Sequence, residues 1–302
     1  MKINLVSFYS ENDPYDKGIN LLESKDIFIT SAKDHVDNIF LYSPRILKEK
    51  NFEYSVKEYP VSDLVTMNPN TNFVGFLAWK PLIMLLELKK MNDGDILVYR
   101  DINCLKYPQL KNFNDFKENI IKLLDICKFD FFISFDPYGF TAENLCKTNI
   151  IKKLGEDHKF SYNYPMLIAN FIIVRKSRIS EELLNEWLEN CKIEEYIDGL
   201  KYGELSEKFT RSTPEQSILT IIIANWIRKC KYNIPKTYPE VILEGRNYDR
   251  PIIRPEFNHL DFIKNEDVCS DLIKANKYNK TFELITNIIL LIFFIFLQYV
   301  PY

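Results

Sequence analysis

Three polar residues follow directly on a short apolar segment in the first half of the chain. Residues 96–99 are Ile-Leu-Val-Tyr, and Arg100, Asp101 and Asn103 come next. A short, continuous apolar run is typical of a strand that is covered on both faces of a sheet. Ligands of open α/β sheets bind in the crevice beyond the carboxyl ends of the strands. Asp101 is therefore the first candidate site residue.

The segment before this strand predicts a buried helix. Pro81 suits the first turn of a helix, where its missing N–H is not needed. Residues 82–88 carry five Leu or Ile side chains and leave little polar face. The sequence Asn92-Asp93-Gly94 is expected to end the helix, with Gly94 at a positive φ.

The order of these pieces resembles a set of bacterial and viral glycosyltransferases of the GT-A fold. The resemblance rests on a Trp-Lys-Pro helix start, a Tyr-x-Asp-x-x-Cys strand end and, later, the sequence Glu-Gln-Ser-Ile-Leu at residues 215–219. It covers roughly residues 2 to 233. Asn103 stands where those relatives carry Gly, and two histidines that precede their Asp-Gln-Ser-Ile-Leu element are missing here.

The resemblance implies a site for the diphosphate of a nucleotide-sugar, held through Mn²⁺ or Mg²⁺. Asp101 would anchor the cation, and Asn103 would add a neutral oxygen ligand. Because glycosyl transfer builds negative charge on the departing diphosphate, a cation or basic side chains must stabilise it. Lys80 and Arg100 are the candidate phosphate contacts.

Glu215 and Gln216 have two interpretations. An inverting enzyme needs a carboxylate base for the acceptor hydroxyl, and Glu215 is the candidate by motif; Gln216 would then lie beside the donor. A retaining enzyme needs no such base. Alternatively Thr213, Pro214 and Gln216 form a helix start with a capping box, and Glu215 only favours the helix electrostatically.

Two further residues are candidate donor contacts. Tyr9 follows the first predicted strand, where the resemblance implies contact with the nucleotide base; it is otherwise an ordinary exposed tyrosine. Asn170 interrupts the apolar run 166–174. A buried Asn needs hydrogen-bond partners, so it serves either the backbone or a sugar hydroxyl.

The remaining periodicities predict an α/β fold, and the resemblance makes it a GT-A-like three-layer sandwich with a mostly parallel central sheet. Residues 196–211 are expected to form a polar loop, long enough to act as a lid. The expected strands are residues 2–9, 36–42, 131–135 and 166–174, and the expected helices are residues 16–33, a short one from Pro44, 112–127, 141–154 and 179–191.

Composition excludes several classes of function. A net charge of −3 over 302 residues gives no field attractive to nucleic acid. The six cysteines have no zinc-type spacing and are expected to be buried thiols in a reducing compartment. None of the eight glycines falls into a dinucleotide or P-loop fingerprint.

The C-terminal part of the chain is strongly apolar. We expect a catalytic domain over residues 1–277 and a hydrophobic tail over residues 278–302. Residues 284–300, as a helix, would span ~25 Å, slightly less than the ~30 Å of a bilayer core. The alternative is a buried C-terminal helix. Because residues 288–297 have no polar face, we favour a membrane anchor, with the catalytic domain on the cytosolic side.

The sequence therefore predicts a nucleotide-sugar-dependent glycosyltransferase, hexosyltransferase-like, with a glycan, lipid or protein as acceptor. The alternative is a non-catalytic, membrane-tethered relative that only binds the nucleotide-sugar. A nucleotidyltransferase is disfavoured because residues 7–15 contain neither the glycine nor the lysine expected of its phosphate loop.

Overall fold

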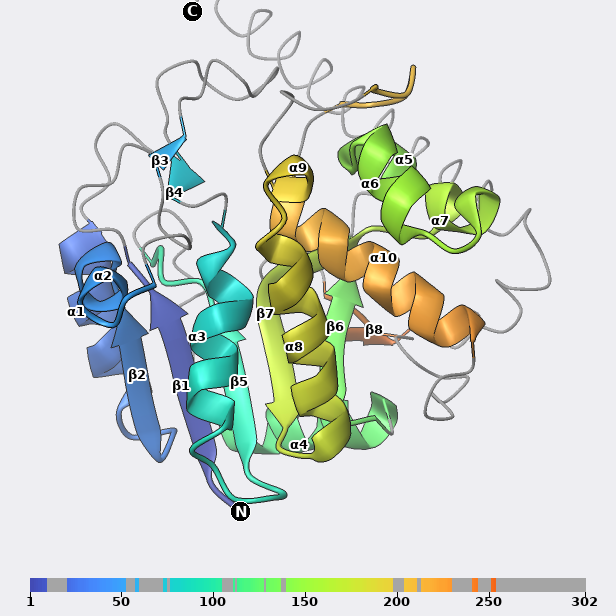
Figure 1. Ribbon diagram of the computed structural model, residues 1–302. Helices are drawn as coiled ribbons and strands as arrows, with labels where there is room; N and C mark the ends of the chain where they lie inside the picture. Colours follow the sequence, from blue (N-terminus) through green and yellow to red (C-terminus); the bar gives the residue numbers. More distant parts are fainter. Residues whose placement is uncertain are drawn as a thin grey trace, which may run out of the picture.

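A computed structural model shows an α/β domain built on one large mixed sheet (Figure 1). It describes residues 1–9, 21–52, 58–59, 73–74, 77–104, 111, 113–127, 129–136, 140–197, 204–210, 213–229, 241–243 and 251–253.

The sheet has seven strands in the order β2-β1-β5-β7-β6-β8-β9. A separate antiparallel pair, β3 and β4, lies outside it. The strands expected from the sequence are all present. Their bounds are β1 (Ile3–Phe8), β2 (Asn38–Tyr42), β3 (Glu58–Tyr59), β4 (Phe73–Val74), β5 (Ile96–Arg100), β6 (Phe131–Phe135), β7 (Leu167–Arg175), β8 (Val241–Leu243) and β9 (Pro251–Ile253).

The strand directions bring several strand ends together at one edge of the sheet. β1 pairs in parallel with both β2 and β5, and β6 pairs in parallel with β8. β7 lies between β5 and β6 and is antiparallel to both. The carboxyl ends of β1, β5 and β6 therefore meet the amino end of β7 at the same edge, which is the upper edge in Figure 1.

Helices cover both faces of this sheet. α3 and α8 lie side by side on the front face in Figure 1, and α10 packs on α8. α4 lies on the rear face, where Phe28 of α1 meets Phe113, just before α4, edge to face. The helices are α1 (Leu21–Ala32), α2 (Pro44–Glu49), α3 (Trp79–Leu88), α4 (Phe116–Cys127), α5 (Ala142–Leu145), α6 (Thr148–Leu154), α7 (His158–Asn163), α8 (Arg178–Cys191), α9 (Glu194–Ile197) and α10 (Pro214–Arg228).

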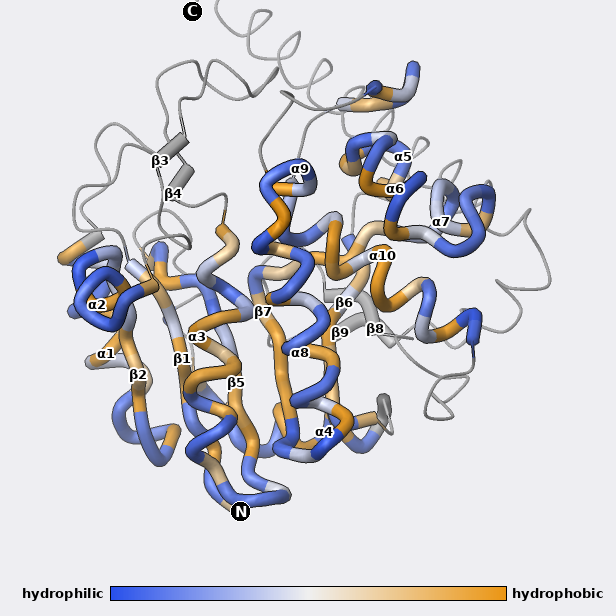
Figure 2. The backbone as a smooth tube through the Cα atoms, in the orientation of Figure 1, coloured by the Kyte–Doolittle hydropathy of each residue, from blue (hydrophilic) through white to orange (hydrophobic). Residues whose placement is uncertain are grey.

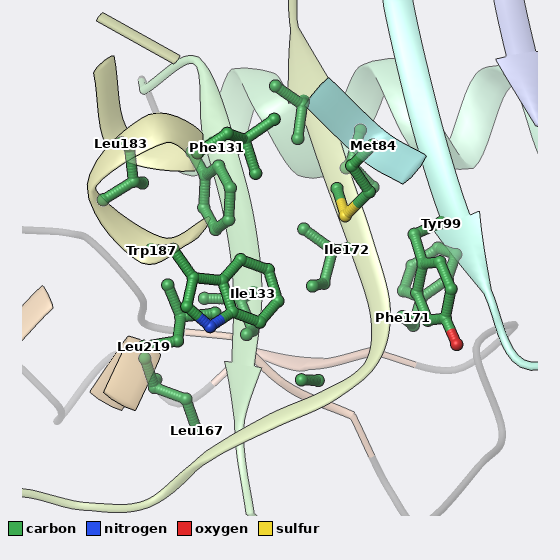
Figure 3. Packing of buried hydrophobic residues seen from close by; sticks show 14 of the residues in the cluster. Met84, Tyr99, Phe131, Ile133, Leu167, Phe171, Ile172, Leu183, Trp187 and Leu219 are labelled. Atoms are coloured by element: carbon green, nitrogen blue, oxygen red, sulfur yellow. The ribbon is translucent and has the colours of Figure 1, made fainter. Parts of the chain in front are cut away.

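The core lies between the sheet and these helices. Apolar residues run along β5, β7 and the inner side of α3 in Figure 2. Figure 3 shows Met84 of α3 and Trp187 of α8 beside Ile172 of β7, and all three are buried. The predicted inner face of α8 is confirmed, because Leu183, Leu184, Trp187 and Leu188 are at most 5% exposed. Burial of such side chains is the main force that holds the layers together.

One predicted helix is wrong. Residues 141–154 form two short helices, α5 and α6, separated by Cys146 and Lys147 in extended conformation. The Lys147 side chain is fully buried, and its Nζ donates to the carbonyl of Glu195 at 2.7 Å. The carbonyl of Leu145 accepts from the Ser217 hydroxyl at 2.9 Å. Tertiary hydrogen bonds thus replace those that a continuous helix would make.

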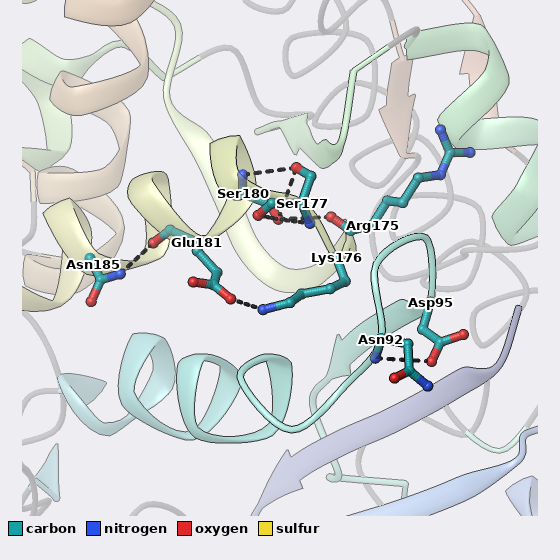
Figure 4. A network of polar contacts seen from close by, with 8 residues as sticks. All are labelled: Asn92, Asp95, Arg175, Lys176, Ser177, Ser180, Glu181 and Asn185. Atoms are coloured by element: carbon teal, nitrogen blue, oxygen red, sulfur yellow. Dashed lines mark hydrogen bonds and ion pairs between the residues drawn. The ribbon is translucent and has the colours of Figure 1, made fainter.

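The predicted end of α3 is too late, so Gly94 does not end the helix, but its predicted positive φ is confirmed. α3 ends at Leu88, and Gly94 has φ +85° in the turn that leads into β5. The Gly94 N–H donates to the carbonyl of Lys176, just before α8. Figure 4 shows this corner, where the Lys176 ammonium pairs with Glu181 and Asp95 accepts from the Asn92 N–H.

The expected loop 196–211 is only partly a loop. Tyr196 and Ile197 belong to α9 and are buried. Residues 204–210 lie against α5 and α6, because Ser206 donates to the carbonyl of Glu143 and Thr210 to that of Asn144. Residues 198–203 and 211–212 lie outside the described residues, so the lid stays a prediction.

The tail at residues 278–302 also lies outside the described residues. Among the helices that the structure does describe, none is both long and apolar enough to cross a bilayer.

Candidate functional site

The candidate site lies at the edge of the sheet where β5 ends and β7 begins. Asp101 is the first residue after β5, and its N–H donates to the carbonyl of Asn170 at 3.0 Å. The pairing of β6 with β7 shifts register here, because Ile133 pairs with Ile172 but Ser134 pairs with Ile168. β7 is therefore irregular at Asn170, and irregularities of this kind often re-aim side chains beside active sites.

Asp101 is held by its side chain as well as by its backbone. The Tyr99 hydroxyl donates to Asp101 Oδ1 at 2.9 Å. Tyr99 is 1% exposed, whereas Asp101 is partly exposed. A buried donor thus fixes a carboxylate that reaches the surface of the edge.

Lys80 and Glu215 form a buried ion pair beside Tyr99. Lys80 Nζ lies 2.8 Å from Glu215 Oε1, and the two side chains are 5% and 2% exposed. The ammonium also lies 5.2 Å from the centroid of the Tyr99 ring and 5.9 Å from that of Trp79. The Trp187 Nε1–H donates to the Glu215 carbonyl at 2.8 Å. Side chains from α3, β5, α8 and α10 therefore converge on this pair.

The Glu215 carboxylate is not fully satisfied by the pair. Its second oxygen, Oε2, is buried and has no hydrogen-bond partner among the residues that the structure describes. Removing one member of a buried ion pair leaves the other charge uncompensated, which is strongly destabilising. Glu215 does lie in the first turn of α10, as the helix-start interpretation predicts, but its buried pair with Lys80 adds a role that this interpretation does not include.

Gln216 does not cap α10. Its Oε1 accepts from the N–H of Ala169 at 3.1 Å, so the side chain joins α10 to β7 next to Asn170. Thr213 occupies the N-cap position without a side-chain cap hydrogen bond, and Pro214 is the first helical residue. The predicted position of Pro214 is confirmed, and the predicted capping box is wrong because β7 offers Gln216 a different partner.

Arg100 and Tyr9 lie on the opposite face of the sheet from Lys80. The Arg100 side chain is fully buried, with its guanidinium 4.6 Å from the centroid of the Phe113 ring. Lys25 of α1 lies 5.2 Å from the centroid of the Tyr9 ring. The two candidate phosphate contacts, Lys80 and Arg100, therefore do not converge.

Asn103 is partly exposed, two residues beyond Asp101. Within the described ranges, no three Asp, Glu, His or Cys side chains gather as cation ligands. A cation at this edge would take Asp101 and Asn103 as protein ligands and its other ligands from phosphate oxygens and water, a set that suits Mg²⁺ and Mn²⁺.

The sequence placed Trp79 and Tyr99 in motifs but assigned neither of them a role in the site. Trp79 stacks on Phe8, the last residue of β1, with ring centroids 3.9 Å apart and planes at 13°. Tyr99 donates to Asp101, a contact that the motif alone did not predict. The signal that would have found it is its spacing, since residues two apart on a strand share one face, here with Asp101.

Burial raises the pKa of the three free cysteines that the structure describes. Burial raises the pKa of Cys104 to about 11, although Arg100 and Lys111 act in the opposite direction. Burial raises the pKa of Cys146 to about 12, and that of Cys191 well above its usual range. Because the thiolate is the reactive form, these cysteines behave as buried apolar side chains at neutral pH, as predicted.

Comparison of the chain with models of protein families, with curated proteins and with solved structures gave no match.

Proposed function

We propose that the protein is a glycosyltransferase of the GT-A type that transfers a sugar from a nucleoside-diphosphate donor to a glycan, lipid or protein acceptor. One observation carries the proposal. Asp101 stands at the carboxyl end of a central strand, and three further candidate residues, Lys80, Asn170 and Gln216, lie at the same edge on α3, β7 and α10.

The proposed donor site is organised by a divalent cation on Asp101 and Asn103. When bound, Mn²⁺ or Mg²⁺ would neutralise the charge that develops on the departing diphosphate. Asn170 is the proposed contact for sugar hydroxyls, Gln216 supports it from α10, and Tyr9 remains the proposed contact for the nucleotide base.

Basic side chains take a secondary part in this proposal. Lys80 is engaged by Glu215, and Arg100 lies on the opposite face over Phe113. A direct phosphate contact from either would require the side chain to exchange its present partner. The cation is therefore the principal means of stabilising the diphosphate.

The role of Glu215 follows from its surroundings. Its motif makes it the candidate general base, and a base must reach the acceptor hydroxyl within hydrogen-bond distance. Its carboxylate is 2% exposed and paired with Lys80, which favours a supporting role. We therefore propose that the acceptor proton goes to another group or that the reaction proceeds with retention.

The alternative function is a non-catalytic relative that binds the nucleotide-sugar without transferring it. Asn103 favours this alternative, because a neutral ligand in place of a second carboxylate weakens a cation site. Such a protein would be stabilised by donor and Mn²⁺ but would neither transfer nor hydrolyse the sugar.

The test is a thermal-shift screen of nucleotide-sugars, each with and without Mn²⁺, followed by transfer and hydrolysis assays on the donor that stabilises most. We expect Mn²⁺-dependent stabilisation of the wild type and its loss in Asp101→Ala, with turnover abolished and the fold retained. Undiminished turnover in Asp101→Ala would refute the assignment. Asp125→Ala is the control, because it removes an exposed carboxylate on α4 that belongs to none of the proposed contacts.

We also propose that residues 284–300 anchor the protein in a membrane and leave the catalytic domain on the cytosolic side. The support is the unbroken apolar run at residues 288–297. A membrane location would suit a lipid-linked acceptor.

A further inference from the structure

We infer that Tyr99 is the residue that positions the Asp101 carboxylate, and that the buried Lys80–Glu215 pair in turn holds Tyr99. Its catalytic meaning rests on the proposed function. The contacts form one chain: Glu215 to Lys80 at 2.8 Å, Lys80 over the Tyr99 ring at 5.2 Å, and the Tyr99 hydroxyl to Asp101 Oδ1 at 2.9 Å.

The first step is the hydrogen bond between Tyr99 and Asp101. The backbone of Asp101 is fixed by its N–H bond to the Asn170 carbonyl, so the hydroxyl of Tyr99 restrains the side-chain rotation that the backbone leaves open. A ligating carboxylate works only if it is held close to its productive geometry. Hydrogen-bond partners that orient metal ligands typically contribute roughly 10–100-fold to metal affinity or activity.

The second step is the contact between Lys80 and the ring of Tyr99. An ammonium over an aromatic face is attracted by the electrons of the ring. It draws electron density from the ring and so makes the hydroxyl a stronger hydrogen-bond donor, as in other polarised chains at low dielectric. Tyr99 and Lys80 are 1% and 4% exposed, so water does not screen this contact.

The third step is the anchoring of Lys80. Its partner Glu215 stands in the first turn of α10 and accepts at its carbonyl from Trp187 of α8. The pair with Glu215 therefore holds the Lys80 ammonium beside the ring of Tyr99.

The test compares Tyr99→Phe with Tyr42→Phe. Tyr99→Phe keeps the buried ring and removes only the hydroxyl. Tyr42→Phe is the matched control, because the Tyr42 hydroxyl also donates to a buried carboxylate, that of Glu87, which is not part of the chain of contacts. The motion of the Asp101 side chain is followed by ¹³C relaxation of labelled carboxyl carbons, and binding of Mn²⁺ and of uridine diphosphate by calorimetry.

We expect Tyr99→Phe to mobilise the Asp101 carboxylate and to weaken Mn²⁺ binding by roughly 10–100-fold, and Tyr42→Phe to change neither. The double variant Lys80→Met/Glu215→Met removes both buried charges together, which folded proteins tolerate better than loss of one. It should mobilise Asp101 in the same direction, and adding Tyr99→Phe should then have a smaller effect than it has alone.

The outcomes separate this inference from the proposed function. An Asp101 carboxylate equally ordered in Tyr99→Phe and the wild type overturns the inference, whatever the activity. Wild-type protein that binds neither Mn²⁺ nor any nucleotide-sugar of the screen, while Tyr99→Phe still mobilises Asp101, overturns the proposed function and supports the inference. If Tyr99→Phe does not fold, the inference is tested by the mobility of the Asp101 carboxylate in the Lys80→Met/Glu215→Met variant.

Discussion

At the scale of single residues, the most consequential pair is Lys80 and Glu215. Both stand in the first turn of a helix, where the helix dipole favours a negative charge and disfavours a positive one. Glu215 is therefore suited to its position in α10, and Lys80 is unsuited to its position in α3 without Glu215. The carboxylate compensates a charge that α3 alone would not tolerate in a buried position.

We predict that Glu215→Gln lowers the free energy of unfolding by ~3–5 kcal/mol, because the Lys80 ammonium is left buried without its counter-charge. Urea denaturation of the variant and the wild type measures this difference in the free energy of unfolding. A helix-start role would cost only ~0.3–1 kcal/mol, so a loss in that range contradicts the prediction. If Glu215 were the general base, the chemical step would also fall roughly 10²–10⁴-fold at unchanged donor affinity.

The sequence singled out Asp101, Lys80 and Glu215 as candidate site residues but did not predict the ion pair between Lys80 and Glu215. Asp101 follows from a local pattern, an apolar strand that turns polar at its end. Lys80 and Glu215 are 135 residues apart in the sequence, and no local pattern predicts an ion pair over that separation. For the same reason Gln216 was assigned to a cap: the competing partner, the Ala169 N–H, is supplied by a distant strand.

At the scale of the elements, local patterns were reliable wherever one face or both faces of an element are buried. β5, β6 and α8 were predicted within one or two residues because their apolar periodicity is strong. The break between α5 and α6 was missed because its cause is tertiary: the buried Lys147 reaches the carbonyl of Glu195. Local patterns also could not predict that β7 is antiparallel to its neighbours, because an apolar run has the same appearance in a parallel and in an antiparallel strand.

Gly94 gives the prediction that belongs to this scale. Nothing lies within 4 Å of a Cβ built on Gly94, so a substitution there meets only backbone strain at φ +85°. Gly94→Ala should lower the free energy of unfolding by ~1–2 kcal/mol, the usual cost of left-handed backbone for a residue with a Cβ. Gly94→Asn should cost less, because Asn tolerates this conformation better. Equal losses in the two variants would argue against backbone strain as the cause.

At the scale of the whole molecule, removal of the tail tests the proposed membrane anchor. We predict that a chain ending near residue 278 is absent from the membrane fraction and more soluble than the full chain, and melts as cooperatively. The reason is that an apolar helix docked on the domain would still present an apolar face to water. If the segment were core instead, its removal would cost ~1.5–3 kcal/mol for each large side chain that loses its contacts.

We would compare the full-length and the truncated chain by cell fractionation with and without detergent. Thermal melting of the truncated chain measures its stability and cooperativity. Full-length protein found entirely in the soluble fraction without detergent would overturn the membrane proposal. Precipitation of the truncated chain would point to the buried alternative.

The position of β7 has a consequence for folding during synthesis on the ribosome. β5 and β6 leave the ribosome before β7, yet each pairs with β7 along one of its edges. Until residues 167–175 emerge, two strongly apolar strands carry unpaired backbone groups that other nascent chains can pair with. The central part of the sheet can therefore be completed only after β7 has been synthesised.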